Sequence, residues 1–213
     1  KNVIQELKTS SLDDIISALA LYRPGPMDII PTFIKRKFGK EKVSYPHEDL
    51  HAILKETYGT IVYQEQIMQI AVKFAGYTLG RADILRRAVS KKKKDVLEQE
   101  RISFVDSSMK KGYLRSVAEE IYDYIVKFAD YGFNKAHSVA YAKLSYQTAY
   151  LKCHYPTYYM STLMTTFIGS NNDIVSYYKE ALRKNIGVLG PNINESLNYF
   201  ASVNNNILFP LTI

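Results

Sequence analysis

Residues 61–95 read IVYQEQIMQIAVKFAGYTLGRADILRRAVSKKKKD, and this stretch contains two helical patterns, one on each side of Gly76. In the first pattern the apolar residues recur at intervals of three and four, which places them on one face of a helix. These residues are Ile67, Ile70, Ala71 and Phe74. Gly76 follows them, where a helix commonly ends on a glycine. The pattern therefore predicts an amphipathic helix whose apolar face packs into a core.

The second pattern, from Arg81 to Lys94, sets a basic face against an apolar one on a helical wheel. The apolar face carries Ala82, Leu85, Ala88 and Val89. The opposite face carries Asp83, Arg86, Arg87 and Ser90. We therefore expect an amphipathic helix that displays an arginine pair outward and leads into a run of four lysines.

The arginine pair Arg86-Arg87 is the sharpest chemical signal in the sequence. A guanidinium binds phosphate through two parallel hydrogen bonds and stays charged at any physiological pH. The alternative is a surface ion pair between Asp83 and Arg87, four residues apart, with Arg86 left in water. The residues alone do not decide between these two interpretations.

The lysine run that follows, Lys91, Lys92, Lys93 and Lys94, carries four positive charges in succession. Such a run can hold a phosphodiester backbone by charge alone. The alternative is a solvated loop with no ligand, which is the commoner role of a lysine run.

Away from this stretch, apolar periodicity predicts further short helices and hence a mainly α fold. The expected helical segments are 11–22, 28–39, 46–59, 95–112, 116–132, 133–155, 156–169 and 172–187. Ser11 is expected to cap the first of them, and Ser116 with Glu119 has the pattern of a capping box. Pro24-Gly25 suits the centre of a type II turn.

After Gly187 the sequence changes to β-type runs with an asparagine-rich turn. We therefore expect a helical domain over 1–187 and the start of a β-containing segment over 188–213.

Length and charge narrow the class of protein. The chain has 213 residues, a formal net charge of +7 and a sequence pI of about 9.2. A basic balance favours an anionic partner such as nucleic acid. Cys153 is the only cysteine, which excludes a disulfide framework within the sequence and fits a reducing cytoplasm. The chain starts at Lys1 and stops in a strand-like run, so we expect it to be part of a longer protein.

Neither a signal peptide nor an apolar run of the ~20 residues that a membrane span needs is present. The sequence therefore predicts no membrane partner. His47 and His51 have the spacing of a possible metal pair, but two surface histidines are the simpler interpretation.

Residues 131–152 alternate aromatic and basic side chains. Aromatic rings can stack on bases while lysines hold phosphates. The alternative is that tyrosines at helical spacing are half-buried core.

Nucleotidyl transfer requires two metal ions held by carboxylates, and the chain has no Asp-x-Asp pair. It also lacks a Walker motif. Glu98 and Glu100 are expected to be solvated charges on different faces of a helix. Residue chemistry alone therefore stops at a basic, mostly helical, nucleic-acid-binding domain.

Three motifs taken together resemble one family. They are ALYRPGPM (20–27), TYGTIVYQEQIMQIAVKFAGYTLGRADILRRAVSKKK (57–93) and FADYGFNKAHSVAYAKLSYQTAYLKCHYP (128–156). They are similar to the fingers domain of the alpha subunit of bacterial DNA polymerase III, a C-family replicative polymerase. The likeness runs in order from about Ser11 to Tyr199, and the segment after Gly187 resembles the approach to the family's helix-hairpin-helix module. Where the family usually has RRAMGKKK, this chain has RRAVSKKK.

The resemblance implies a DNA-directed DNA polymerase acting in bacterial chromosomal replication in the cytoplasm. Its catalytic aspartates, which bind Mg²⁺, would lie in a palm outside this chain, so the isolated chain would not polymerise. The implied partners are template-primer DNA, deoxynucleoside triphosphates and other replicase subunits, such as the sliding clamp, through other regions. The resemblance does not separate replicative from error-prone types.

Site residues also follow from the resemblance. Arg86 and Arg87 match the family's arginine pair near the triphosphate, and Lys91–Lys94 would lie along the DNA backbone. Arg23, Asn134, Lys135 and His137 match motif positions that would line the same cleft. The alternatives are a basic helical DNA-binding module without a polymerase role, or a module that docks protein subunits.

Overall fold

A computed structural model describes residues 2–91, 94–128 and 131–212 of the chain. The chain divides into two compact units, Lys1–Lys143 and Leu144–Ile213. The division falls within the long helix α9 (Lys135–His154). It does not coincide with residue 187, where the helical part ends and the strands begin, so the expected domain boundary there stays a prediction.

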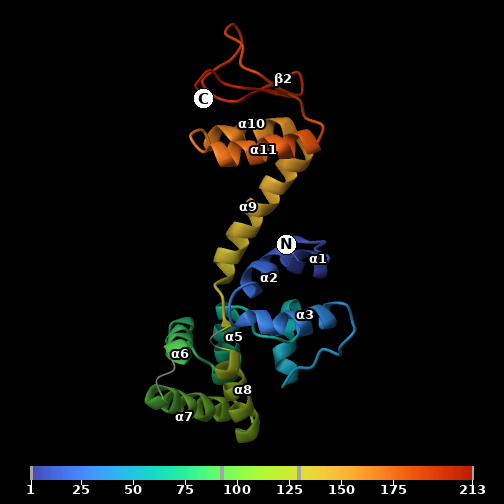
Figure 1. Cartoon of the computed structure of the whole chain (residues 1–213). Helices are drawn as coiled ribbons and strands as arrows, with labels where there is room; N and C mark the ends of the chain where they lie inside the picture. The colour runs from blue at the N-terminus through green and yellow to red at the C-terminus, as the bar shows by residue number, and fades with distance from the viewer. Residues whose placement is uncertain (1, 92–93, 129–130, 213) are drawn as a thin grey trace. The chain divides into compact units, whose positions relative to one another are not determined.

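The regular secondary structure of the first unit consists mainly of helices in its described residues (Figure 1). Its α-helices are α1 (Asn2–Glu6), α2 (Leu12–Leu21), α3 (Ile30–Lys37), α4 (His51–Leu54), α5 (Gln64–Ala75), α6 (Leu79–Lys91), α7 (Lys94–Lys110), α8 (Arg115–Phe128) and the start of α9. Short 3₁₀ turns are η1 (Pro26–Ile29), η2 (Glu48–Leu50) and η3 (Lys55–Thr57). The predicted mainly α fold is confirmed.

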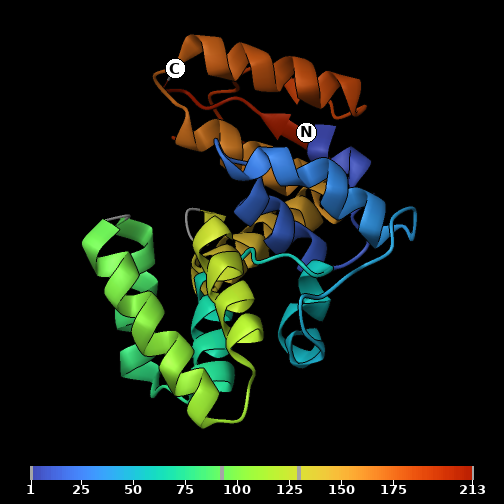
Figure 2. The same ribbon diagram turned by 90° about the horizontal axis from the view of Figure 1, so that it is seen from below.

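The largest apolar cluster of this unit forms where α5, α6, α7 and α8 pack together (Figure 2). It contains every residue of the predicted apolar face of α5: Ile67, Ile70, Ala71 and Phe74. The predicted apolar face of α6 is buried as well: Ala82, Leu85, Ala88 and Val89. Both faces are confirmed, so the outward side of α6 carries the arginine pair as expected.

A second cluster joins α2 and α3 to Val62 and Tyr63, which precede α5. Ser11 caps α2 in a complete capping box with Asp14, as the sequence predicts for the cap. Gly25 has φ +96°, the left-handed conformation expected of it. Pro26 has no N–H to close a type II turn, and the Met27 N–H reaches the Arg23 carbonyl at 3.3 Å instead.

The predicted helix over 46–59 is wrong, because the segment breaks into the short pieces η2, α4 and η3. Side chains occupy the backbone acceptors that a continuous helix would use. Gln66 Nε2 donates to the Ile53 carbonyl at 3.2 Å, and the Thr57 hydroxyl donates to the Leu54 carbonyl at 3.3 Å. The segment ends at Gly59, whose φ is +78°.

The expected capping box at Ser116 is also wrong. The Ala118 N–H bonds to the Leu114 carbonyl at 3.0 Å, so α8 begins at Arg115 and Ser116 lies inside its first turn. Glu100 is not a solvated charge, because its carboxylate receives Arg81 Nη2 at 2.7 Å and its side chain is 13% exposed.

The second unit packs two helices on a small sheet. It contains the end of α9, α10 (Pro156–Thr166), α11 (Asn171–Arg183), β1 (Val188–Leu189), β2 (Ala201–Val203) and β3 (Asn206–Leu208). The strand order is β1-β3-β2, with β1 parallel and β2 antiparallel to β3. Asn204 and Asn205 both have positive φ, as a tight hairpin turn requires, so the predicted strands and asparagine turn are confirmed.

Tyrosines of α9 are more exposed than the core interpretation predicts: Tyr146 is 53% and Tyr150 is 45% accessible. Within the described part of the chain, no helix is long and apolar enough to cross a bilayer.

Candidate functional site

The arginine pair of α6 is built around one carboxylate. Asp83 Oδ1 receives both Arg86 Nε at 2.8 Å and Arg86 Nη2 at 2.7 Å. Its other oxygen, Oδ2, receives Arg87 Nη2 at 2.7 Å. The hydrogen bond from Arg86, followed by the positive charges of Arg86 and Arg87, lowers the pKa of Asp83. The sequence alternative of an Asp83–Arg87 ion pair is therefore present, but Arg86 is not left in water.

The two arginines differ in exposure. The Arg86 side chain is 19% exposed, whereas that of Arg87 is 66% exposed. Arg86 also donates from Nη1 to Oε1 of Gln64 at 3.2 Å. Arg86 is therefore bound to both Asp83 and Gln64, while most of the Arg87 side chain is exposed to solvent.

Gln64 lies at a junction of two segments that are far apart in sequence. Its backbone N–H donates to the Phe133 carbonyl at 2.9 Å, and the Phe133 N–H donates to the Val62 carbonyl at 2.9 Å. These bonds form a parallel β-bridge between Tyr63 and Phe133. We call Val62–Gln64 together with Phe133 the bridge junction.

The start of α9 is fixed by the residue after Gln64. Both carboxylate oxygens of Glu65 receive the Lys135 backbone N–H at 3.0 Å, and the Asn134 side-chain amide donates to Oε1 at 3.2 Å. Asn134 Oδ1 in turn accepts the His137 backbone N–H at 2.7 Å. Asn134 therefore caps α9 and is bound on both sides of its amide.

Lys135 and His137 project from the first turn of α9 toward other neighbours. Lys135 Nζ pairs with Glu56 at 2.7 Å and lies 5.3 Å from the centre of the Tyr63 ring. The His137 ring lies between two aromatic rings, with centroids 5.4 Å from Phe133 and 4.5 Å from Tyr141.

Arg23 reaches the same junction from the turn after α2. Its guanidinium lies 4.9 Å from the centre of the Phe133 ring and donates to the backbone carbonyls of Ala20, at 3.0 Å, and Tyr131. Burial lowers the pKa of Arg23. The contacts of Arg23 are thus with the protein itself, and they hold the turn against Phe133.

The structure accordingly brings five of the predicted residues to the bridge junction: Arg23, Arg86, Asn134, Lys135 and His137. Arg87 follows Arg86 on the outer side of α6. The side chains of Lys91–Lys94 lie outside the described residues. The sequence did not identify Asp83, Gln64 or Glu65 as site residues. The polar run YQEQ, at the start of the amphipathic helix α5, was the available signal.

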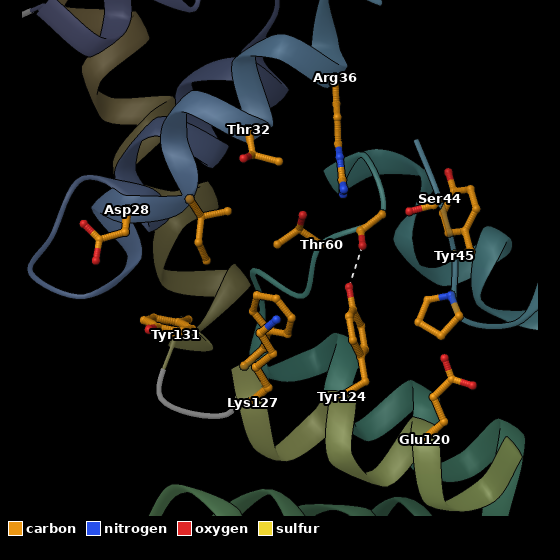
Figure 3. Close-up of a pocket in the computed structure, with 14 residues that line it drawn as sticks. Asp28, Thr32, Arg36, Ser44, Tyr45, Thr60, Glu120, Tyr124, Lys127 and Tyr131 are labelled. Atoms are coloured by element: carbon orange, nitrogen blue, oxygen red, sulfur yellow. Dashed lines mark hydrogen bonds between the residues drawn. The ribbon is translucent and has the colours of Figure 1, made fainter. Parts of the chain in front are cut away.

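A separate cavity of about 670 Å³ lies in the first unit between α3 and α8 (Figure 3). Arg36 enters it from α3, and Lys127 and Tyr124 enter from α8. Arg36 is held by Glu41 at 2.9 Å, and the Tyr124 hydroxyl donates to the Gly59 carbonyl at 2.5 Å. The lining includes neither arginine of the α6 pair.

A metal site would need several donor side chains close to one another in the part of the chain that the structure describes. No group of three or more histidine, cysteine, aspartate or glutamate side chains lies together there as a metal site. His47 instead accepts the Asp49 backbone N–H at 3.2 Å through Nδ1, and His51 packs edge-on against Tyr45.

Comparison with known proteins gives a family match and close relatives. Residues 1–112 match the model of the bacterial DNA polymerase III alpha subunit finger domain. The chain is 53% identical over 211 residues to DNA polymerase III subunit alpha of Bacillus subtilis (strain 168), covering 99% of this chain and 19% of that protein. Identity is 46% over 211 residues to the proteins of the same name from Halalkalibacterium halodurans and Staphylococcus epidermidis, with 99% of this chain and 19% or 20% of the relative covered. The chain thus spans about a fifth of the length of these curated relatives.

Proposed function

The chain belongs to the bacterial DNA polymerase III alpha subunit finger domain family, and on that premise we propose that it binds the incoming deoxynucleoside triphosphate and template-primer DNA for a DNA-directed DNA polymerase. The nucleotidyl transfer itself would take place in a larger protein acting in bacterial chromosomal replication, in the cytoplasm. Its catalytic carboxylates would come from a palm outside this chain. Other replicase subunits, including the sliding clamp, would bind through other regions as well.

The observation that carries this proposal is the arrangement of the α6 pair. The two guanidinium groups of Arg86 and Arg87 share the carboxylate of Asp83. Most of Arg87 is accessible to a ligand. A guanidinium can hold phosphate oxygens through two parallel bonds, and cations near the β- and γ-phosphates offset the charge that develops as pyrophosphate leaves.

Mg²⁺ is the cofactor that such chemistry requires, and its ligands would be the palm carboxylates. The described side chains of this chain include no group of three or more carboxylate, histidine or cysteine donors that could hold the ion. What this chain contributes is binding and orientation: the α6 pair for the triphosphate, Lys91–Lys94 for the DNA backbone, and Arg23, Asn134, Lys135 and His137 as the wall beside them.

The test is single-nucleotide incorporation by the complete polymerase carrying Arg87→Ala. Loss of a charge-assisted contact of roughly 1.5–3 kcal/mol should lower kcat/KM about tenfold or more. Arg115→Ala is the matched control, since Arg115 is 60% exposed and also pairs within its helix, with Glu119 at 3.6 Å. Normal incorporation by Arg87→Ala would remove the assignment and favour a DNA-binding or docking module.

A further inference from the structure

The two arginines of the α6 pair are bound so differently that a single shared role does not describe them. We propose that Arg87 is the guanidinium that contacts the triphosphate, whereas Arg86 is a positioning residue held by Asp83 and Gln64. This inference rests on the proposed function, because it assigns separate tasks within the same site.

All three guanidinium nitrogens of Arg86 donate hydrogen bonds to protein side chains. Nε and Nη2 donate to Asp83 and Nη1 donates to Gln64. A triphosphate approaching Arg86 would have to displace both partners from a side chain that is only 19% exposed. The contacts therefore fix the rotamer of Arg86 and connect α6 to the bridge junction.

Arg87 is constrained at one nitrogen only. Nη2 pairs with Asp83 Oδ2, and Nε and Nη1 make no further hydrogen bond to a described residue. Because Arg86 holds the Asp83 carboxylate by two bonds, the carboxylate is presented to Arg87 in one orientation, and Arg87 is restrained without being covered.

Gln64 is an uncharged residue that connects Arg86 of α6 to the bridge junction. Its amide oxygen accepts a hydrogen bond from Arg86. Its backbone N–H donates to the carbonyl of Phe133, the residue that precedes Asn134, the cap of α9. A neutral acceptor suits this position, because it binds the guanidinium without cancelling the positive charge that an anionic ligand needs. The side chain thus sets the position of α6 relative to the start of α9.

The experiment uses the complete polymerase and measures kcat and KM for one nucleotide. Gln64→Met keeps the side-chain length but removes the acceptor. We expect kcat/KM to fall roughly threefold to tenfold, the worth of about one hydrogen bond, mainly through a higher KM. Gln69→Met is the matched control, since Gln69 is an exposed residue of the same helix. Gln64→Glu restores an acceptor oxygen but adds a negative charge beside the arginine pair, so KM should stay raised.

Combining variants tests whether Gln64 acts through Arg86. Arg86→Lys cannot bridge Asp83 and Gln64, so Gln64→Met should change KM by less than about twofold in that background. In the Arg87→Ala background its effect should also largely disappear, because the guanidinium that Arg86 positions is absent. A general folding defect would instead lower the melting temperature and the fraction of active enzyme with KM unchanged, and this outcome would overturn the inference.

The other outcomes separate the two proposals. Normal kinetics for Gln64→Met with impaired Arg87→Ala would overturn the present inference and leave the proposed function standing. Larger loss from Arg86→Lys than from Arg87→Ala, without dependence on Gln64, would overturn the division of roles. Normal incorporation by Arg87→Ala would overturn the proposed function and this inference together.

Discussion

Glu65 accepts the backbone N–H of Lys135, 70 residues later in the chain, on both of its carboxylate oxygens at 3.0 Å. The same carboxylate receives the Asn134 amide, so it satisfies the first turn of α9 from outside the helix. We predict that Glu65→Ala lowers the free energy of unfolding by about 1–3 kcal/mol, because part-buried donors lose a charged acceptor. Glu98→Ala, at an exposed residue, should change it by less than about 0.5 kcal/mol in the same melts. Equal effects would contradict the role of Glu65.

Arg86→Ala and Arg87→Ala should differ in stability. The expectation from the helical wheel, that neither arginine is needed for packing, holds only for Arg87, since Arg86 bonds to Asp83 and Gln64. We expect Arg86→Ala to cost about 1–2 kcal/mol and Arg87→Ala less than about 0.5 kcal/mol. Thermal melting of both variants checks this. A larger loss from Arg87→Ala would mean that the exposed ion pair, and not the Gln64 contact, holds α6.

Gly59 should tolerate no side chain. Its φ is +78°, and a Cβ there would lie 2.7 Å from the Ser44 carbonyl oxygen. Gly39 has φ +67° but nothing within 4 Å of its Cβ position. Gly39→Ala therefore measures the cost of the positive φ alone, without a steric clash. Gly39→Ala should cost about 1 kcal/mol, and Gly59→Ala should cost at least about 1 kcal/mol more. The free energies of unfolding from denaturant titration give the difference, and equal losses would show that Ser44 moves away freely.

Three tyrosines should resist deprotonation in the folded chain. Burial raises the pKa of Tyr63, Tyr113 and Tyr124 to about 12, and a hydrogen bond to Asp49 adds to the effect at Tyr113. Their neutral form is favoured by folding, so their contribution to stability is complete below the unfolded value near 10 and is lost as pH rises through about 12. Tyrosinate absorbance at alkaline pH measures this. Replacing all three by Phe should remove the component near pH 12, and titration of all three near 10 in the folded chain would contradict it.

Affinity for DNA should depend on salt through the lysine run. If each of Lys91–Lys94 neutralises a phosphate, replacing all four by Ala should flatten the slope of log affinity against log salt by as much as ~3 to 4 units. Replacing Lys35, Lys37, Lys110 and Lys111 by Ala makes the same charge change elsewhere and serves as the control. An unchanged slope in the first variant would identify the run as a solvated loop.

Periodicity predicted the helices that form the core. In α5 and α6 the apolar residues recur every three to four positions, which is a local pattern that the sequence shows directly. Periodicity failed over 46–59, where Gln66 and Thr57 take carbonyls that a continuous helix would need. Gln66 lies outside the segment, so its hydrogen bond to the Ile53 carbonyl could not be predicted from residues 46–59 alone.

The charged residues of the candidate site could be predicted from the sequence, but the contacts between them could not. The arginine pair and the FNKAH segment were identified as site residues from motifs. Their meeting at Gln64 and Phe133 depends on a β-bridge of one residue pair, which has no period and leaves no sequence pattern. Glu100 shows the same limit, since its partner Arg81 lies on a neighbouring helix.

The bridge junction also has a topological consequence. The chain leaves the junction at Gln64, forms α5, α6, α7 and α8, and returns to it at Phe133, where the two strands are hydrogen-bonded side by side. Residues 64–133 therefore form an insertion whose entry and exit coincide. The two hydrogen bonds of the bridge close this long excursion at its base, so they limit how far the start of α9 can move from the start of α5.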